Sequence, residues 1–95
     1  MVFDISKIKG IGEFTVKKEE KRELYFKNEQ VFLVTHENTI EVRSDEKLSA
    51  LLKEKYETIM ESRYFGHGGI EIVLAGQLSD SEIEDLIRLS YNLTN

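Results

Sequence analysis

Four segments in the first half of the chain alternate hydrophobic and polar residues or are wholly apolar, which is the pattern of β-strands. They are residues 13–18, 22–27, 31–34 and 39–43. Only a few polar residues separate each segment from the next, and such short connections favour an antiparallel meander. Because 31–34 is apolar at every position, it is predicted to be an internal strand with a neighbour on each side.

The spacing then changes to that of a helix. Leu48, Leu51, Leu52 and Tyr56 recur at helical intervals after a polar start at Asp45, which predicts a helix from about Asp45 to Tyr56. Residues 58–60 are expected to form a short extended piece. The stretch 61–69, which holds three of the six glycines, is expected to be irregular.

The last quarter of the chain has the clearest pattern. Residues 70–74 predict a buried strand, and Ser79 with Glu82 has the spacing of a capping box at a helix start. The apolar residues of that helix cover about half of its circumference at about 100° per residue, so the helix is predicted to be largely buried. Leu86 is expected in the core. The hydroxyl of Tyr91 should reach water or a polar partner, and that of Ser90 should bond back one turn.

Together these elements predict a single α+β domain over residues 1–95, with a mainly antiparallel sheet of four or five strands and two main helices packed on one face. The face without helices is expected to expose Tyr25, Phe32 and Val34, because strict alternation points Phe32 and Val34 away from Val31 and Leu33. A homodimer or another protein partner could cover that apolar surface.

Residues 74–93 read Leu-Ala-Gly-Gln-Leu-Ser-Asp-Ser-Glu-Ile-x-x-Leu-Ile-x-x-Ser-Tyr-x-Leu. This ending resembles the C-terminus of the MmcQ/YjbR-like family and of the small luciferase-type domain family. The matching positions are Gly76, Asp80, Glu82, Leu86, Ile87, Ser90, Tyr91 and Leu93. The resemblance implies an α+β sheet with helices on one side, and for the first family a DNA-binding role has been suggested from its fold. Residues 63–69 of this chain lack the Trp of that family, and their basic content is one Arg where that family has a His/Asn/Lys/Arg-rich stretch.

Composition narrows the function classes. The 95 residues carry a net charge of -5, and from Leu48 onward there are four basic and eight acidic residues, which argues against general phosphate binding. The chain has no cysteine, so disulfides and thiolate ligands are excluded. No apolar run has the length of a membrane span, and a cytoplasmic location is expected.

One stretch has residues suited to a ligand site. Arg63, Tyr64, His67, Gly68 and Gly69 combine a cation, an aromatic ring and an imidazole with glycines that let a backbone approach a ligand. The segment is no phosphate loop, because no Gly-Lys-Ser/Thr follows and it leads into a strand. The alternative interpretation is a flexible loop anchored by two aromatic residues.

A metal site would require His36 and His67, 31 positions apart, to converge with a carboxylate such as Glu71. Since the histidines have no local ligand spacing, neither a metal site nor a cofactor is expected. No serine has a neighbouring histidine that would make it a nucleophile, so catalysis is not expected.

The sequence therefore predicts a non-catalytic binding or interaction module. Two alternatives stay open. The first is a small-molecule-binding protein or minor enzyme that uses the Tyr64–Gly69 loop. The second is nucleic-acid binding through the lysines of the N-terminal hairpin, which is less expected because glutamates interrupt those lysines.

Overall fold

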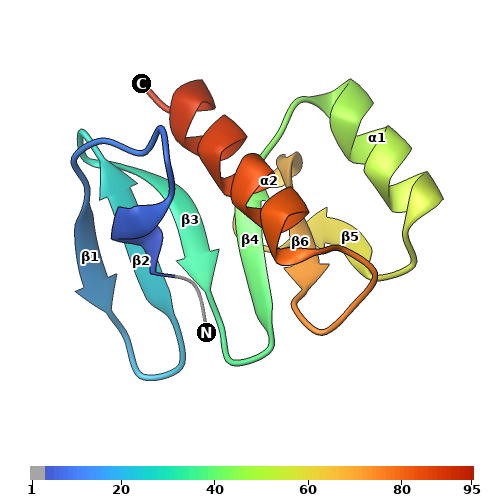
Figure 1. The fold of residues 1–95 in the computed structure, drawn as a ribbon, viewed down its shortest axis with the longest axis horizontal. Helices are drawn as coiled ribbons and strands as arrows, with labels where there is room; N and C mark the ends of the chain where they lie inside the picture. The colour runs from blue at the N-terminus through green and yellow to red at the C-terminus, as the bar shows by residue number, and fades with distance from the viewer. Residues whose placement is uncertain (1–3) are drawn as a thin grey trace.

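The computed structural model describes residues 4–95 and shows an α+β fold. A six-stranded antiparallel sheet has the order β1-β2-β3-β4-β6-β5, and both α-helices lie on one of its faces (Figure 1). The strands are β1 (Thr15–Lys18), β2 (Glu23–Lys27), β3 (Gln30–Thr35), β4 (Thr39–Arg43), β5 (Ile59–Ser62) and β6 (Gly66–Val73). The helices are the 3-10 turn η1 (Ile5–Lys7), α1 (Glu46–Lys55) and α2 (Asp80–Leu93). The predicted fold class and meander are confirmed.

The sheet has six strands rather than four or five because most of the stretch expected to be irregular is extended. β5 and β6 form a hairpin around the three-residue turn Arg63–Phe65. Gly66 leaves that turn with a φ of 60°, a conformation that glycine adopts without steric cost. Glycine is depleted in strands, so propensity gave no hint that Gly66, Gly68 and Gly69 lie inside one.

β3 is internal, between β2 and β4, as predicted. Its alternation is broken by a β-bulge. Tyr25 lies opposite Leu33, whereas Phe26 lies opposite Val31, so Phe32 is an extra residue without a partner on β2. As a result, Phe32 and Leu33 both join the core under the helices, while Val31 packs with other residues on the opposite face.

The apolar patch predicted on the helix-free face is therefore wrong. Phe32 is fully buried against Tyr91 of α2, and Tyr25 packs beside it on the helix side. Val34 does face away from the helices, but it is fully buried in a second, smaller cluster with Leu24.

We expect the amides of Val31–Val34 to exchange with solvent much more slowly than those of Glu20 and Lys21. The first group belongs to a buried strand with neighbours on both sides, and the second lies in an exposed bend. Local opening costs least where backbone groups face water and few apolar contacts must break. Amide exchange followed by NMR measures both groups in one sample. Equal rates would contradict the internal position of β3.

Helix α2 packs on β3 and β4 through Ile83 and Ile87, which are fully buried. Tyr91 behaves as predicted, since its ring is buried and its hydroxyl donates to the Glu13 carbonyl at 2.9 Å. Leu86 is only half-buried and packs at the margin of the core. The buried face of α2 is thus centred closer to Ile83 and Ile87 than the distribution of apolar residues around the helix indicated.

Ser90 differs from its prediction as well. Its hydroxyl donates to the Phe32 carbonyl and accepts from the Arg43 amide, instead of bonding back along its own helix. The small side chain at this fully buried position lets α2 approach two strands and joins the helix to both. It also gives the bulged residue of β3 a partner for its carbonyl group.

The predicted capping box at the start of α2 is present, with Ser79 Oγ accepting from the Glu82 amide and Glu82 Oε1 accepting from the Ser79 amide. Ser79→Ala is expected to lower the free energy of unfolding by about 1 kcal/mol, the usual effect of removing one N-cap bond. Ser81→Ala is a matched control, because Ser81 is exposed in the same helix turn. Urea denaturation compares them, and equal effects would contradict a capping role.

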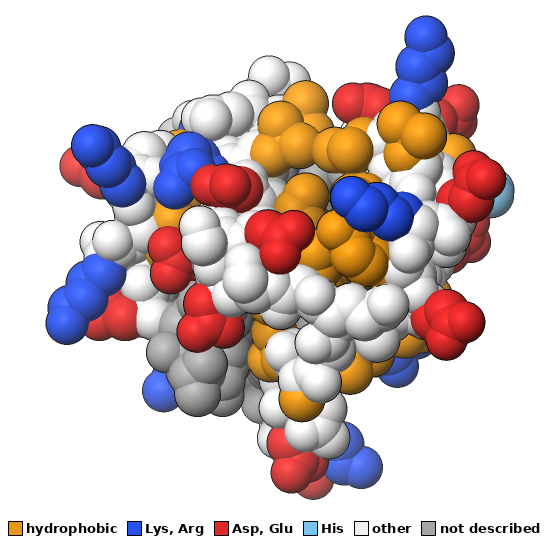
Figure 2. Space-filling model, turned by 45° about the vertical axis from the view of Figure 1, so that its right-hand side comes forward, with side chains coloured by type: hydrophobic (Ala, Val, Ile, Leu, Met, Phe, Trp, Pro, Cys, Tyr) orange, Lys and Arg blue, Asp and Glu red, His pale blue; other side chains and the backbone are white. Residues whose placement is uncertain are grey.

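Helix α1 is more loosely attached. Asp45 caps it by accepting from the Leu48 amide at 2.8 Å, but Ser49 is its only buried residue, and Leu51 is 64% exposed. Figure 2 brings this side of the molecule forward and shows hydrophobic side chains gathered there among charged ones. Exposed apolar surface thus lies on the helix side. Within residues 4–95, no helix has the length and apolar character needed to cross a membrane.

Candidate functional site

Two glutamates lie side by side in the middle of the helix-free face. Each sits between aliphatic residues, in Ile40-Glu41-Val42 of β4 and in Ile70-Glu71-Ile72 of β6. The aliphatic neighbours point into the core beneath the helices, so alternation directs both glutamates to the other face. Glu41 and Glu71 are direct cross-strand partners, and only 1% and 3% of their surfaces are exposed.

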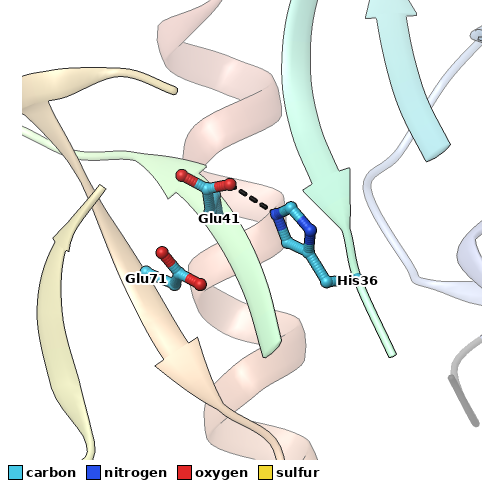
Figure 3. A group of neighbouring side chains, drawn as sticks. All are labelled: His36, Glu41 and Glu71. Carbon is cyan, nitrogen blue, oxygen red and sulfur yellow. Dashed lines mark hydrogen bonds and ion pairs between the residues drawn. The ribbon is translucent and has the colours of Figure 1, made fainter. Parts of the chain in front are cut away.

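Glu41 accepts three hydrogen bonds. Its Oε1 atom accepts from Ser62 Oγ and from the Tyr64 amide, each at 2.8 Å, and its Oε2 atom lies 2.6 Å from Nε2 of His36. Figure 3 shows the last contact, with α2 behind the sheet. Because these groups come from the residue after β3, from β5 and from the turn after β5, Glu41 joins the two halves of the sheet on this face.

Glu71 holds an arginine. The Arg63 guanidinium donates to both carboxylate oxygens, at 2.9 and 2.8 Å, and Thr39 Oγ1 donates to Oε2 at 2.8 Å. The hydrogen bonds from Arg63 to Glu71, and then the attraction between their charges, raise the pKa of Arg63. The Arg63 side chain is nevertheless 69% exposed, so the ion pair joins a buried anion to a cation in contact with water.

The turn between β5 and β6 folds over this face of the sheet. Phe65 covers the small apolar cluster of Leu24, Val31 and Val34, and the Arg43 guanidinium lies over its ring. Gly69 is beneath Phe65, where a Cβ atom would lie 2.5 Å from the Val42 carbonyl oxygen. Gly69 therefore serves the close approach of the turn to the strand, and any larger residue would push the two apart.

The Glu41 carboxyl is buried, and burial raises its pKa. Hydrogen bonds from His36, the Tyr64 amide and Ser62 outweigh that effect and hold the pKa below its ordinary value of 4.5. The carboxylate form is consequently stabilised by the fold.

This shift predicts a loss of stability in acid. A group whose pKa is lower in the folded than in the unfolded state stabilises the fold above the unfolded pKa, here about 4.5, and that contribution is lost as the pH falls through the folded pKa. Glutamine does not titrate. The difference in unfolding free energy between wild-type and Glu41→Gln should therefore shrink from about pH 7 to about pH 3. Urea denaturation across this range measures it, and a constant difference would be the contrary result.

The structure divides the predicted ligand-binding residues into two groups. Arg63 and Tyr64 lie at the glutamate pair, the first by its side chain and the second by its amide. The His67 side chain is 87% exposed, and its Nδ1 atom lies 2.9 Å from Oε1 of Glu61. Gly68 accepts from the Ser44 amide through its carbonyl, and Gly69 is the packing position under Phe65.

Sequence reasoning missed Glu41 and named Glu71 only as a carboxylate that would complete a metal site with both histidines. One signal could have found them. The same motif, a glutamate between two β-branched aliphatic residues, occurs on two strands, and a charge at the centre of such strands needs a partner when its face is covered. His36 was considered as a ligand, but its neighbour in space is Glu41 rather than His67.

The lysine-bearing hairpin offers little free positive charge. The ammonium groups of Lys17 and Lys18 lie 3.9 and 3.8 Å from carboxylate oxygens of Glu19 and Glu23, respectively. The Arg22 guanidinium donates to the Glu19 carboxylate at 2.6 Å. This arrangement favours the interpretation of a solvated, charge-paired edge over a phosphate-binding surface. Next to His36, residues 18–23 and 35–37 line an open hollow of about 540 Å³.

Comparisons with known proteins identify the fold alone. No protein-family model matches the chain, and no curated protein does. A crystal structure of a protein from Pseudomonas syringae, determined by a structural genomics consortium, is similar with a TM-score of 0.74. It is 18% identical, and the match covers 86% of this chain and 87% of that one.

Proposed function

We propose that this chain is a non-catalytic interaction module and that a protein partner binds its helix-free face around Met60, Arg63 and Tyr64. The proposal rests mainly on one observation. Glu41 binds the backbone of the turn that bears Arg63 and Tyr64, Glu71 binds the Arg63 guanidinium, and the side chains of both turn residues remain exposed. Fixed side chains lose little conformational entropy on binding, which is what a recognition surface requires.

The residue types support the same conclusion. Met60 pairs with Glu71 across β5 and β6, so its exposed side chain lies on this face beside Arg63. The ring of Tyr64 packs edge-to-face against the ring of Phe65, and the Arg22 guanidinium lies 5.6 Å from the centre of the Tyr64 ring. Tyrosine, arginine and methionine are enriched in protein interfaces, where lysine and glutamate are depleted.

A catalytic reading has less support from the same geometry. His36 with Glu41 has the form of a base with an orienting carboxylate, yet within residues 4–95 no hydroxyl donates to His36. Ser62 instead donates to Glu41 and accepts from the Phe65 amide, which is a structural arrangement.

The test is a comparative pull-down from an extract of the source organism, with tagged wild-type, Tyr64→Ala and Leu51→Ala. A partner of the proposed face should be lost with Tyr64→Ala and kept with Leu51→Ala, because Leu51 is exposed on the helix side. Titration of the purified partner should then show a Kd weakened roughly 10- to 30-fold by Tyr64→Ala. Recovery that is the same with all three proteins, or lost only with Leu51→Ala, would overturn the proposal.

A further inference from the structure

We propose that His36, Glu41 and Glu71 form a binding site for a divalent transition-metal ion such as Zn²⁺, for which Arg63 is the built-in competing cation. This inference does not depend on the protein partner, because the three ligands are buried or half-buried beneath the surface that a partner would contact.

The three side chains already converge. One imidazole nitrogen and one oxygen from each carboxylate lie within 4.8 Å of one another. Zinc bonds to nitrogen and oxygen are about 2.0–2.2 Å long, so two ligand atoms of one ion are about 3.3 Å apart in a tetrahedron. The widest separation must therefore shrink by at most about 1.5 Å, and the 2.6 Å contact between His36 Nε2 and Glu41 Oε2 must lengthen by about 0.7 Å. Rotations of the Glu71 and His36 side chains can supply both changes while the paired strands stay in place.

Charge favours a cation at this place. Glu41 and Glu71 are directly opposite each other on two internal strands, and like charges in that position destabilise a sheet. Arg63 contributes one positive charge against the two carboxylates. A divalent ion contributes two, and it bonds to all three side chains at a single point.

Arg63 can leave at small cost. Its side chain comes from the turn after the edge strand β5 and is already 69% exposed, so the released guanidinium returns to water that it largely contacts now. Glu71 has its hydrogen bond from Thr39 as a second support for its orientation. Exchange of Arg63 for a metal ion therefore requires release of one surface side chain and rotation of the Glu71 and His36 side chains, with no rearrangement of the backbone.

The donor set selects the class of ion. One imidazole with two carboxylates suits zinc, manganese or iron, whereas magnesium and calcium prefer sites made of oxygen alone. Three protein ligands leave at least one coordination position for water or for a group from outside. The hollow lined by residues 18–23 and 35–37 borders His36, and the Arg63 side chain on Glu71 is 69% exposed, so the three ligands lie close to solvent.

Calorimetric titration of chelator-treated protein with ZnCl₂ tests the proposal, with MgCl₂ in parallel. We expect one saturable zinc site per chain and no magnesium binding up to about 1 mM. Glu71→Gln and His36→Ala should each weaken zinc binding at least about 10-fold. His67→Ala is the matched control, because that exposed histidine pairs with Glu61 and should leave the affinity unchanged.

Arg63→Gln gives the decisive result. Removing the competing cation should tighten zinc binding, whereas a surface site elsewhere would not respond. Circular dichroism confirms that each variant is folded, and the Arg63→Gln comparison stands even where a ligand variant does not fold. Absence of saturable zinc binding in both wild-type and Arg63→Gln would overturn the proposal. Binding that survives Glu71→Gln but is lost in His67→Ala would overturn it too, because the ion would then lie at the His67–Glu61 pair.

Discussion

Phe32→Ala should lower the free energy of unfolding by about 3–5 kcal/mol, the range for truncating a buried phenylalanine. The ring has no exposed surface and packs edge-on against Tyr91 at a centroid distance of 4.9 Å, with Phe14 and Tyr25 at its other edges. Its loss leaves a cavity where α2, β2 and the N-terminal segment meet. The whole free energy of unfolding of a domain of this size is only about 5–10 kcal/mol, so this change could unfold much of the protein.

Phe26→Ala is the matched control. Phe26 is half-buried on the opposite face of the sheet, where it packs against the smaller cluster of Leu24, Val31 and Val34. Truncation of Phe26 is expected to lower the free energy of unfolding by about 1–2 kcal/mol. Urea denaturation of both variants gives the ordering. If Phe26→Ala were the more damaging change, the β-bulge at Phe32 and the assignment of faces derived from it would be wrong.

That bulge marks the limit of what alternation could predict about the sheet. Period-two patterning located the first four strands and the internal position of β3, because both depend on local sequence. The face of Phe32 depends on its pairing with β2, where one extra residue shifts the register between Tyr25 and Phe26. Nothing in an all-apolar run such as Val31–Val34 shows where an extra residue is inserted.

The helices illustrate a second limit. The capping residues Asp45 and Ser79 were predictable because a cap is a contact between residues three positions apart. The depth of burial was not, because it depends on which strands lie below. Leu51 fits the helical spacing but faces solvent, since α1 packs on β5 and β6 through a narrow stripe around Ser49.

The candidate site was predicted only in part, for the same reason. Arg63 and Tyr64 were identified by their types and by the glycines that follow them. Glu41 lies 22 positions before Arg63, and only the pairing of β4 with β6 brings it next to Glu71. A polar residue in an alternating strand is ordinarily assigned to solvent, and the turn that covers this face was itself expected to be irregular.

Glu41→Ala should destabilise the fold by about 3–5 kcal/mol, the usual cost of breaking a buried polar or ionic cluster by removing one partner. It would leave the Ser62 hydroxyl, the Tyr64 amide and the His36 imidazole without their acceptor. Each buried donor that loses its hydrogen bond costs about 1–3 kcal/mol unless water reaches it. Ser62 is itself buried, so the turn over the sheet should loosen together with the edge strand β5.

Glu71→Gln should cost much less, about 1 kcal/mol or below, although Glu71 is almost as buried. Its main partner, Arg63, is largely in water, the amide oxygen can still accept from Thr39, and the repulsion between the two adjacent carboxylates disappears. Urea denaturation at neutral pH measures both variants. The expected asymmetry means that Glu41 holds the turn in place, while Glu71 contributes little to stability and is available to bind a cation. If Glu71→Gln proved as damaging as Glu41→Ala, the pair would be one structural cluster, and exchange of Arg63 for a metal ion would carry a prohibitive cost.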